Sequence, residues 1–454
     1  MREKFRTFVV LSLASLMPCL AMGQNQETAD SKQPTAFYRL SLQEAIQKAL
    51  QANLSVLVGS TRIEEAEGTQ KRLWSAAMLP RVKAQTYANL QNRNLRAFGI
   101  SLPSMPEVVG PFSNYDVRVS AQQNLIDLES RHNLKAGEQA VDTRKMDLRD
   151  ARDLIVRAIA SLYLNAQSAA ARVTSAQSRV IDGTTLYKLA KDKHDAGTAT
   201  GVDVLRAQVQ LANDKQALLI AENQYQQSLL ALARNLGMNP GTPLALAEPL
   251  QYHPLSQPEA ESLVSSALVA RADYLSLASQ RQELVEKQRA NHARNYPKLS
   301  INGNYGGLGR SIGSIQGTGS LQGQIDFTIF DGDRTGEAAE LASRVKRIDD
   351  QIADLRRGIN QEIREALLNL DSAAQQVSVA TEGQSLAQRE LELAQDRFQS
   401  GTTNNVEVVT AQDELSRAEE NYILAVTSHV DAKCALARAQ GDAEKNILVY
   451  LGNQ

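Results

Sequence analysis

The sequence predicts a mainly α-helical chain with a smaller β portion, built from two copies of one structural unit. Three observations lead to this prediction: an internal repeat, long stretches without proline, and four segments in which apolar and polar residues alternate. The segment KHDAGTATGVDVLRAQVQL at 193–211 returns without a gap as RFQSGTTNNVEVVTAQDEL at 397–415. Prolines are absent from 112–239 and after Pro297. Since similar segments recur in the same order through both halves, we infer an internal duplication.

The first residues, MREKFRTFVVLSLASLMPCLAMGQ, predict a secretory signal peptide over residues 1–23. A basic start is followed by an apolar core, and small residues precede the expected cleavage before Gln24. One alternative is lipidation at Cys19, against which Pro18 argues. Another is a short membrane anchor, which is weak because the apolar stretch is shorter than about 18 residues. We therefore expect the chain to be exported.

The repeat divides the remaining chain into four parts. We expect a first structural repeat over 24–237, a linker over 238–258, a second repeat over 259–441 and a short tail over 442–454. No run of about 20 apolar residues follows the leader. The mature chain is therefore either soluble in the periplasm or crosses a membrane as β-strands.

Four segments of about ten residues each alternate apolar and polar side chains, as a membrane-barrel strand does. They cover 81–91, 116–126, 298–305 and 321–330. Long loops separate the members of each pair, which fits the extracellular side of a barrel. The alternative is two hairpins that cap a soluble sandwich.

Four strands cannot close a barrel in lipid, because an open edge leaves backbone groups unpaired at several kcal/mol each. Transmembrane barrels need at least about eight strands. If these strands span a membrane, several chains must share one barrel. Two copies would make eight strands around a core filled by side chains, and three would make twelve strands around a lumen.

Long helices follow each strand pair. The proline-free segments Asp127–Asp192 and Asp331–Asp396 are rich in strong helix formers, and each would reach on the order of 100 Å at about 1.5 Å per residue. A second helix follows each of them and carries a seven-residue apolar stripe, which predicts coiled-coil packing. The stripe positions are Val204, Leu211, Leu218, Tyr225 and Leu232 in the first copy, and Val408, Leu415, Tyr422, His429 and Leu436 in the second.

The repeated Gly-Thr segments are therefore predicted to be the tips of two helical hairpins. Gly197 and Gly401 occupy the position of a C-terminal helix cap, where glycine is favoured.

At this point the chain resembles the TolC family of outer-membrane efflux channels, over nearly the whole mature sequence. The motifs that carry the resemblance are SLQEAIQKALQANLSV from Ser41, LPRV at 79–82, YPKLSINGNYGG at 296–307, TIFDGDRTGEAAELA from Thr328, and the duplicated AGTATGVDVLRAQ and SGTTNNVEVVTAQDEL. The resemblance implies a homotrimer with a twelve-strand β-barrel in the outer membrane, four strands from each chain. It also implies a long α-helical barrel across the periplasm and partners in the form of a periplasmic adaptor and an inner-membrane transporter.

In that family the hairpin turns form the periplasmic tip where the adaptor docks. This role carries over to Gly197, Thr198, Gly401 and Thr402, where the glycines allow close backbone approach and the threonines offer hydroxyl groups. The alternative is that these residues cap helices and contact no partner.

The resemblance also implies a pore constriction near the tip. Asp203 and Glu407 occupy the matching first acidic position after each turn, and three chains would bring six carboxylates together, which favours cations. The alternative is an acid placed favourably in the first turn of a helix. The second acidic position of some relatives is Thr410 here, so the ring would be thinner.

Composition and motifs argue against other function classes. The formal net charge is −2 and the basic residues are scattered, which excludes a nucleic-acid footprint. The histidines lack metal-ligand spacing, and no nucleophile motif or phosphate loop is present, so we expect no cofactor and no enzyme activity. We expect His429 to be a packed residue of the stripe.

Two functions remain. One is a passive, gated exit duct of an efflux or type I secretion system in the outer membrane, with drugs, metals or polypeptides all open as cargo. The other is a periplasmic coiled-coil structural or tethering protein without a pore. The four amphipathic strands favour the first.

Overall fold

The computed structural model describes residues 38–100, 103, 106–255 and 259–452. The predicted signal peptide over 1–23, with Cys19, lies outside the described residues. The elements of the first half are β1 (Tyr38–Leu40), α1 (Leu42–Ala52), α2 (Leu54–Met78), β2 (Arg81–Asn94), β3 (Val108–Ile126), α3 (Leu128–Asp195), α4 (Gly201–Asn235) and β4 (Leu244–Leu246). Those of the second half are α5 (Ala260–Ala270), α6 (Ala272–Ala293), β5 (Lys298–Gly309), β6 (Gln316–Asp326), α7 (Gly332–Gln399), α8 (Asn405–Gln440) and α9 (Ala443–Leu451).

Both halves use the same order of elements: two helices, two strands, a very long helix and a second helix that returns along it. This order is what a duplication produces, and the exact bounds of the repeats stay a prediction. The two long helices, α3 and α7, each contain 68 residues. Each begins directly after an aspartate whose side chain caps it, since Asp127 accepts from the Ser130 N–H and Asp331 from the Asp333 N–H. The prediction of two long helices is confirmed.

The four predicted strands form one antiparallel sheet in the order β2-β3-β5-β6, with β2 and β6 at its edges. Polar and apolar residues lie on opposite faces, because Val82 pairs with Ala121 while Lys83 pairs with Ser120. The prediction for the second strand was wrong in its start, since β3 begins at Val108 rather than 116. The prediction for the fourth strand was also wrong in its bounds. It begins at Gln316 rather than 321, where two glycines pair with β5, and it ends at Asp326, because the chain then turns towards the cap at Asp331.

Close backbone approach holds β3 and β5 together at Gly306. A Cβ atom there would lie 2.2 Å from the Val117 carbonyl oxygen, so no other residue fits without moving a strand.

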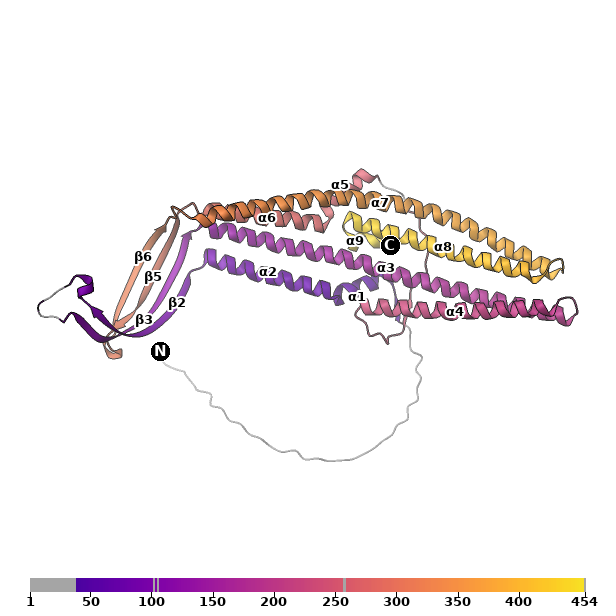
Figure 1. Ribbon diagram of the computed structural model, residues 1–454, viewed down its shortest axis with the longest axis horizontal. Helices are drawn as coiled ribbons and strands as arrows, with labels where there is room; N and C mark the ends of the chain where they lie inside the picture. The colour runs from indigo at the N-terminus through magenta and orange to yellow at the C-terminus, as the bar shows by residue number, and fades with distance from the viewer. Residues whose placement is uncertain (1–37, 101–102, 104–105, 256–258, 453–454) are drawn as a thin grey trace, which may run out of the picture. The chain divides into compact units, whose positions relative to one another are not determined.

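The helices form four columns, a term used here for helices that lie end to end. Figure 1 shows α2 and α4 in line along α3, and α6 and α8 in line along α7. Column α2/α4 packs on α3, α3 packs on column α6/α8, and that column packs on α7. The columns thus follow the same order as strands β2, β3, β5 and β6, with α2/α4 and α7 at the two edges.

The core consists of strips between columns. The predicted seven-residue stripes face these strips, and all ten positions are at least partly buried. Tyr163 of α3 is buried in one such cluster, where its hydroxyl donates to the Leu40 carbonyl at 3.1 Å. The coiled-coil prediction is confirmed, because the residues that recur every seven positions lie on the side of each helix that packs against its neighbours.

A buried arginine fixes the junction between α5 and α6. Arg271 is 3% exposed, donates to Asp273 at 2.7 and 3.1 Å, and pairs with Glu362 of α7. Gly441, after α8, lies so close that a Cβ there would be 2.7 Å from the Arg271 Cα. Helix α5 is therefore locked to α7 and to the end of α8.

Among the described residues, no helix combines the length and the apolar character needed to cross a membrane.

Candidate functional site

The first hairpin tip closes helix α3 with a left-handed glycine. Gly197 has a φ of 75°, and its N–H donates to the His194 carbonyl at 2.9 Å. The N–H of Thr198 donates to the Lys193 carbonyl at 2.8 Å. These two bonds form a Schellman cap, which satisfies carbonyls that the last turn of a helix leaves free.

The second tip repeats this geometry. Gly401 has a φ of 74°, its N–H donates to Phe398, and the Thr402 N–H donates to Arg397 at 3.0 Å. In both tips the threonine hydroxyl also donates to the same carbonyl, at 3.0 Å in each case. The hydroxyl hydrogens are therefore used within the chain, so the threonines present only oxygen lone pairs and methyl groups outward.

The first acidic candidate caps a helix. The Asp203 carboxylate accepts from the hydroxyl of Thr200 at 2.7 Å and from its N–H at 3.1 Å, while the Asp203 N–H donates back to the hydroxyl. This reciprocal arrangement is a capping box. The Asp203 side chain is only 11% exposed. The geometry favours the alternative reading, in which this acid serves the start of α4.

The second acidic candidate forms an ion pair. Glu407 accepts from Arg397 at 2.7 Å and from the Thr403 hydroxyl at 2.5 Å, and its side chain is 38% exposed. Because Arg397 ends α7 and Glu407 begins α8, the pair ties the two helices of one hairpin at the tip.

Two polar contacts join the hairpins to each other at the tips. The Lys193 ammonium donates to the Gln399 carbonyl at 3.0 Å and lies 5.1 Å from the centre of the Phe398 ring. Asn405, fully buried at the start of α8, donates to the Asp203 carbonyl at 2.6 Å. Beneath these contacts, small and apolar residues of α3, α4, α7 and α8 form one cluster. The two tips thus act as one packed end.

Further from the tips, α3 and the C-terminal helices meet through ion pairs that pattern analysis of the sequence missed. Four arginines of α3 each bind a carboxylate of the second half of the chain. The pairs are Arg149–Asp442 at 2.6 Å, Arg152–Glu444 at 2.6 Å, Arg157–Asp431 at 3.1 Å and Arg172–Glu420 at 2.7 Å. Because partners are more than 240 residues apart in sequence, no local spacing signals them. Each partly exposed pair is worth little energy, so this polar seam mainly sets the register of α3 against α8 and α9.

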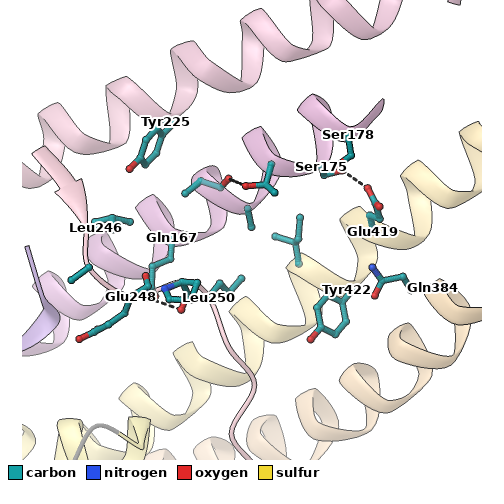
Figure 2. Close-up of a pocket in the computed structure, with 16 residues that line it drawn as sticks. Gln167, Ser175, Ser178, Tyr225, Leu246, Glu248, Leu250, Gln384, Glu419 and Tyr422 are labelled. Carbon is teal, nitrogen blue, oxygen red and sulfur yellow. Dashed lines mark hydrogen bonds between the residues drawn. The ribbon is translucent and has the colours of Figure 1, made fainter. Parts of the chain in front are cut away.

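A cavity of about 580 Å³ opens in this seam (Figure 2). Ser175 of α3 donates to Glu419 of α8 across it, and Tyr225 and Tyr422 line its two sides. The chain that leaves β4 closes one side, where the Gln167 amide donates to the Glu248 carbonyl at 3.0 Å.

The segment 247–255, called the strap here, crosses from β4 towards α5 over α8. Lys433 of α8 is 1% exposed and donates to the His253 carbonyl of the strap. His429 lies one turn earlier against the Tyr252 ring, with 4.8 Å between ring centres. Burial lowers the pKa of His429 to about 4 and also lowers the pKa of Lys433. The prediction that His429 is a packed residue is confirmed, whereas the role of Lys433 was missed.

Within the described part of the chain, no three His, Cys, Asp or Glu side chains gather in a way that could hold a metal ion.

Comparison with known proteins identifies the family. The model of the outer membrane efflux protein family matches residues 45–238 and 263–442. The outer membrane protein OprJ of Pseudomonas aeruginosa is 24% identical over 428 residues, covering 91% of this chain and 87% of that protein. The probable efflux pump outer membrane protein TtgC of Pseudomonas putida is 23% identical over 444 residues, covering 93% and 88%.

Solved structures share the fold. The outer membrane protein VceC of Vibrio cholerae superposes with a TM-score of 0.74 at 17% identity, covering 88% of this chain and 96% of that one. A membrane protein from Pseudomonas aeruginosa gives a TM-score of 0.76 at 21% identity, covering 88% and 90%.

Fold, motifs and family model agree on the exit duct rather than on a tether without a pore. The chain belongs to the outer membrane efflux protein family and acts as an outer-membrane exit duct whose helical part lies in the periplasm.

Proposed function

We propose that three copies of this chain assemble around one axis into a single duct, which docks through its hairpin tips to a periplasmic adaptor and an inner-membrane transporter. One observation carries the proposal. The sheet and the helices of a single chain both end in unpaired edges, and the edges follow the same order.

The sheet requires partners at β2 and β6. These edge strands have no neighbour on their outer sides within the described chain. In lipid their free N–H and C=O groups would each cost several kcal/mol. Because β2 and β6 run antiparallel in the sheet, β6 of one copy can pair with β2 of the next, and this pairing continues the antiparallel order.

The helices require partners at the same two edges. Leu219 of α4 and Val379 of α7 are 67% and 70% exposed. Rotation about an axis parallel to the helices keeps each residue at its distance from the tip. At 1.5 Å per residue, Leu219 lies about 27 Å from the start of α4 and Val379 about 30 Å from the end of α7. Leu219 of one copy and Val379 of the next therefore lie at nearly the same distance from the tips, where they can pack against each other.

The number three follows from the need for a passage. Two copies would give a barrel of eight strands, and side chains fill the interior of such a barrel. Three copies would give twelve strands, which leave a lumen. Outer-membrane lipid would surround the apolar face of this barrel.

Both tips present surfaces suited to a protein partner. A Cβ atom at Gly197 or Gly401 would meet nothing within 4 Å, so the glycines leave open backbone surface at each tip. We propose that an adaptor helix approaches Gly197, Thr198, Gly401 and Thr402, with the threonine methyl groups and lone pairs as contacts. A pore constriction, in turn, would depend on Glu407 more than on Asp203, since the latter is committed to its capping box.

Cysteine crosslinking tests the assembly. The pair Leu219→Cys and Val379→Cys should give dimers and trimers, with no larger species, on oxidation of the protein in membranes. The control pair Leu219→Cys and Leu393→Cys uses the same two helices, but its residues differ by about 18 Å in their distance from the tips. Cys434 is fully buried and should not compete. Crosslinked dimers and trimers with the control pair, or their absence with the matched pair, would refute this arrangement.

Docking has its own test. Photo-crosslinkers attached to Thr198→Cys and Thr402→Cys should capture the adaptor, whereas the same label at Ser262→Cys on α5, far along the helices from the tips, should not.

A further inference from the structure

The junction between the sheet and the helices contains a cavity of about 550 Å³. It lies between the end of α2, the start of β2, the end of β3 and the start of α3. Its polar lining consists of Arg72, Arg81, Ser75, Gln122, Asn124 and Ser130.

Two exposed guanidinium groups line this cavity, and neither has a partner among the residues that the structure describes. Neither Arg72 nor Arg81 forms an ion pair or side-chain hydrogen bond among the described residues. Asp127, which caps α3, is buried and already accepts from two of the lining residues, from Asn124 at 3.0 Å and from Ser130 at 2.7 and 3.1 Å. The cavity therefore carries unbalanced positive charge.

Strand register places this charge on the polar face of the sheet. Arg81 pairs directly with Gln122, so both side chains leave the same face, and Lys83 follows on that face opposite Ser120. The other face carries Val82. In an outer-membrane barrel the apolar face meets lipid and the polar face meets the interior. The cavity thus opens to the interior of the proposed duct rather than to acyl chains.

We propose that this cavity binds a polyvalent anionic group, such as a phosphate, sulfonate or carboxylate cluster, carried by the exported cargo. Arg72 and Arg81 would supply the charge and planar donors, and the hydroxyls and amides would supply further hydrogen bonds. With three copies, three such sites form a basic ring where the helical tunnel enters the barrel, which draws anions through. The position inside a duct rests on the proposed function, whereas the binding does not.

Isothermal titration calorimetry provides the readout, because the single tryptophan of the chain, Trp74, lies two residues from Arg72 on α2 and therefore on another face of the helix. Inorganic pyrophosphate titrated into the purified protein in detergent should give a saturable binding isotherm. Arg72→Gln and Arg81→Gln should each weaken the pyrophosphate affinity at least tenfold, and Arg81→Lys should retain part of it. The control Arg62→Gln removes the same charge from α2 outside the cavity and should bind as the parent does.

Three outcomes would overturn the site. One is equal affinity in the parent and in both glutamine variants. A second is loss of the pyrophosphate isotherm in nanodiscs that contain phosphatidylglycerol but not in nanodiscs of phosphatidylcholine, which would make the cavity a lipid headgroup site. A third is binding that appears only in Asp326→Asn, since Asp326 ends edge strand β6 and a neighbouring copy could neutralise Arg81 with it.

Conductance separates this site from the duct itself. In planar bilayers, pyrophosphate added on the barrel side should reduce the current of the parent more than that of Arg72→Gln. A conducting protein that pyrophosphate leaves unchanged would refute the anion site and leave the duct intact. A protein that never conducts would refute the duct, while the calorimetric titration would still decide the site.

Discussion

Lys193 is the residue whose removal should most selectively loosen the contact between the two hairpin tips. Its ammonium joins the two hairpins by a hydrogen bond to the Gln399 carbonyl and by a cation–π contact with Phe398. At a partly exposed position we take about 0.5–1 kcal/mol for each contact. The variant Lys193→Met keeps the aliphatic stem and should lose about 1–2 kcal/mol of hairpin association per chain.

A loss of that size has a measurable consequence. One to two kcal/mol changes an equilibrium by a factor of roughly 5 to 30, so the open fraction of the duct should rise by that factor for each chain that moves independently. Single-channel recording in planar bilayers measures the open fraction directly. The control Lys191→Met removes the same charge two residues earlier, where no contact between hairpins is present in the described structure. Equal open fractions in the two variants would refute the role given to Lys193.

Three further outcomes follow from the structure. Arg271→Met should lower the unfolding free energy in detergent by about 1.5–3 kcal/mol, because Asp273 and the half-exposed Glu362 lose a charged hydrogen-bond partner; a loss below 1 kcal/mol would contradict the lock at α5. The folded-state pKa of His429 is lowered to about 4, so its neutral form is favoured, and stability should fall as pH drops from about 6.5 towards 4; His429→Phe should flatten this part of the pH profile of the melting temperature, and an unchanged profile would count against it. Gly401→Ala adds a side chain at positive φ without a clash, so it should cost about 1 kcal/mol of stability and leave assembly intact, and Gly197→Ala should behave alike, as differential scanning calorimetry would show.

Local chemistry explains why much of this protein could be predicted from its sequence. Helix ends depend on caps, so the Gly-Thr segments located both hairpin tips, and Asp127 and Asp331 marked where the long helices begin. Strand faces depend on a period of two, so the alternating segments revealed which residues share a side of the sheet. Because the two halves are repeats, the same helix caps and alternating segments were expected in the same order in both halves.

The acidic candidates show where such reasoning stops. Sequence position places Asp203 and Glu407 alike in a first helical turn, and only side-chain geometry separates a capping box from an ion pair with Arg397. The bounds of β6 depended on its partner β5, because glycines have little strand preference of their own and pair where a neighbour is available.

By itself, then, the sequence determined the helices, the strands, the tips and the open edges, since each depends on residues close together along the chain. Only the tertiary structure decided which distant groups meet: the arginines of α3 with the carboxylates of the C-terminal helices, Lys433 with the strap, and Arg72 with Arg81 around an unfilled cavity. The physical reason is that such contacts depend on how the columns pack side by side. A charge pattern read along one helix carries no information about the face that a helix 200 residues away will present to it.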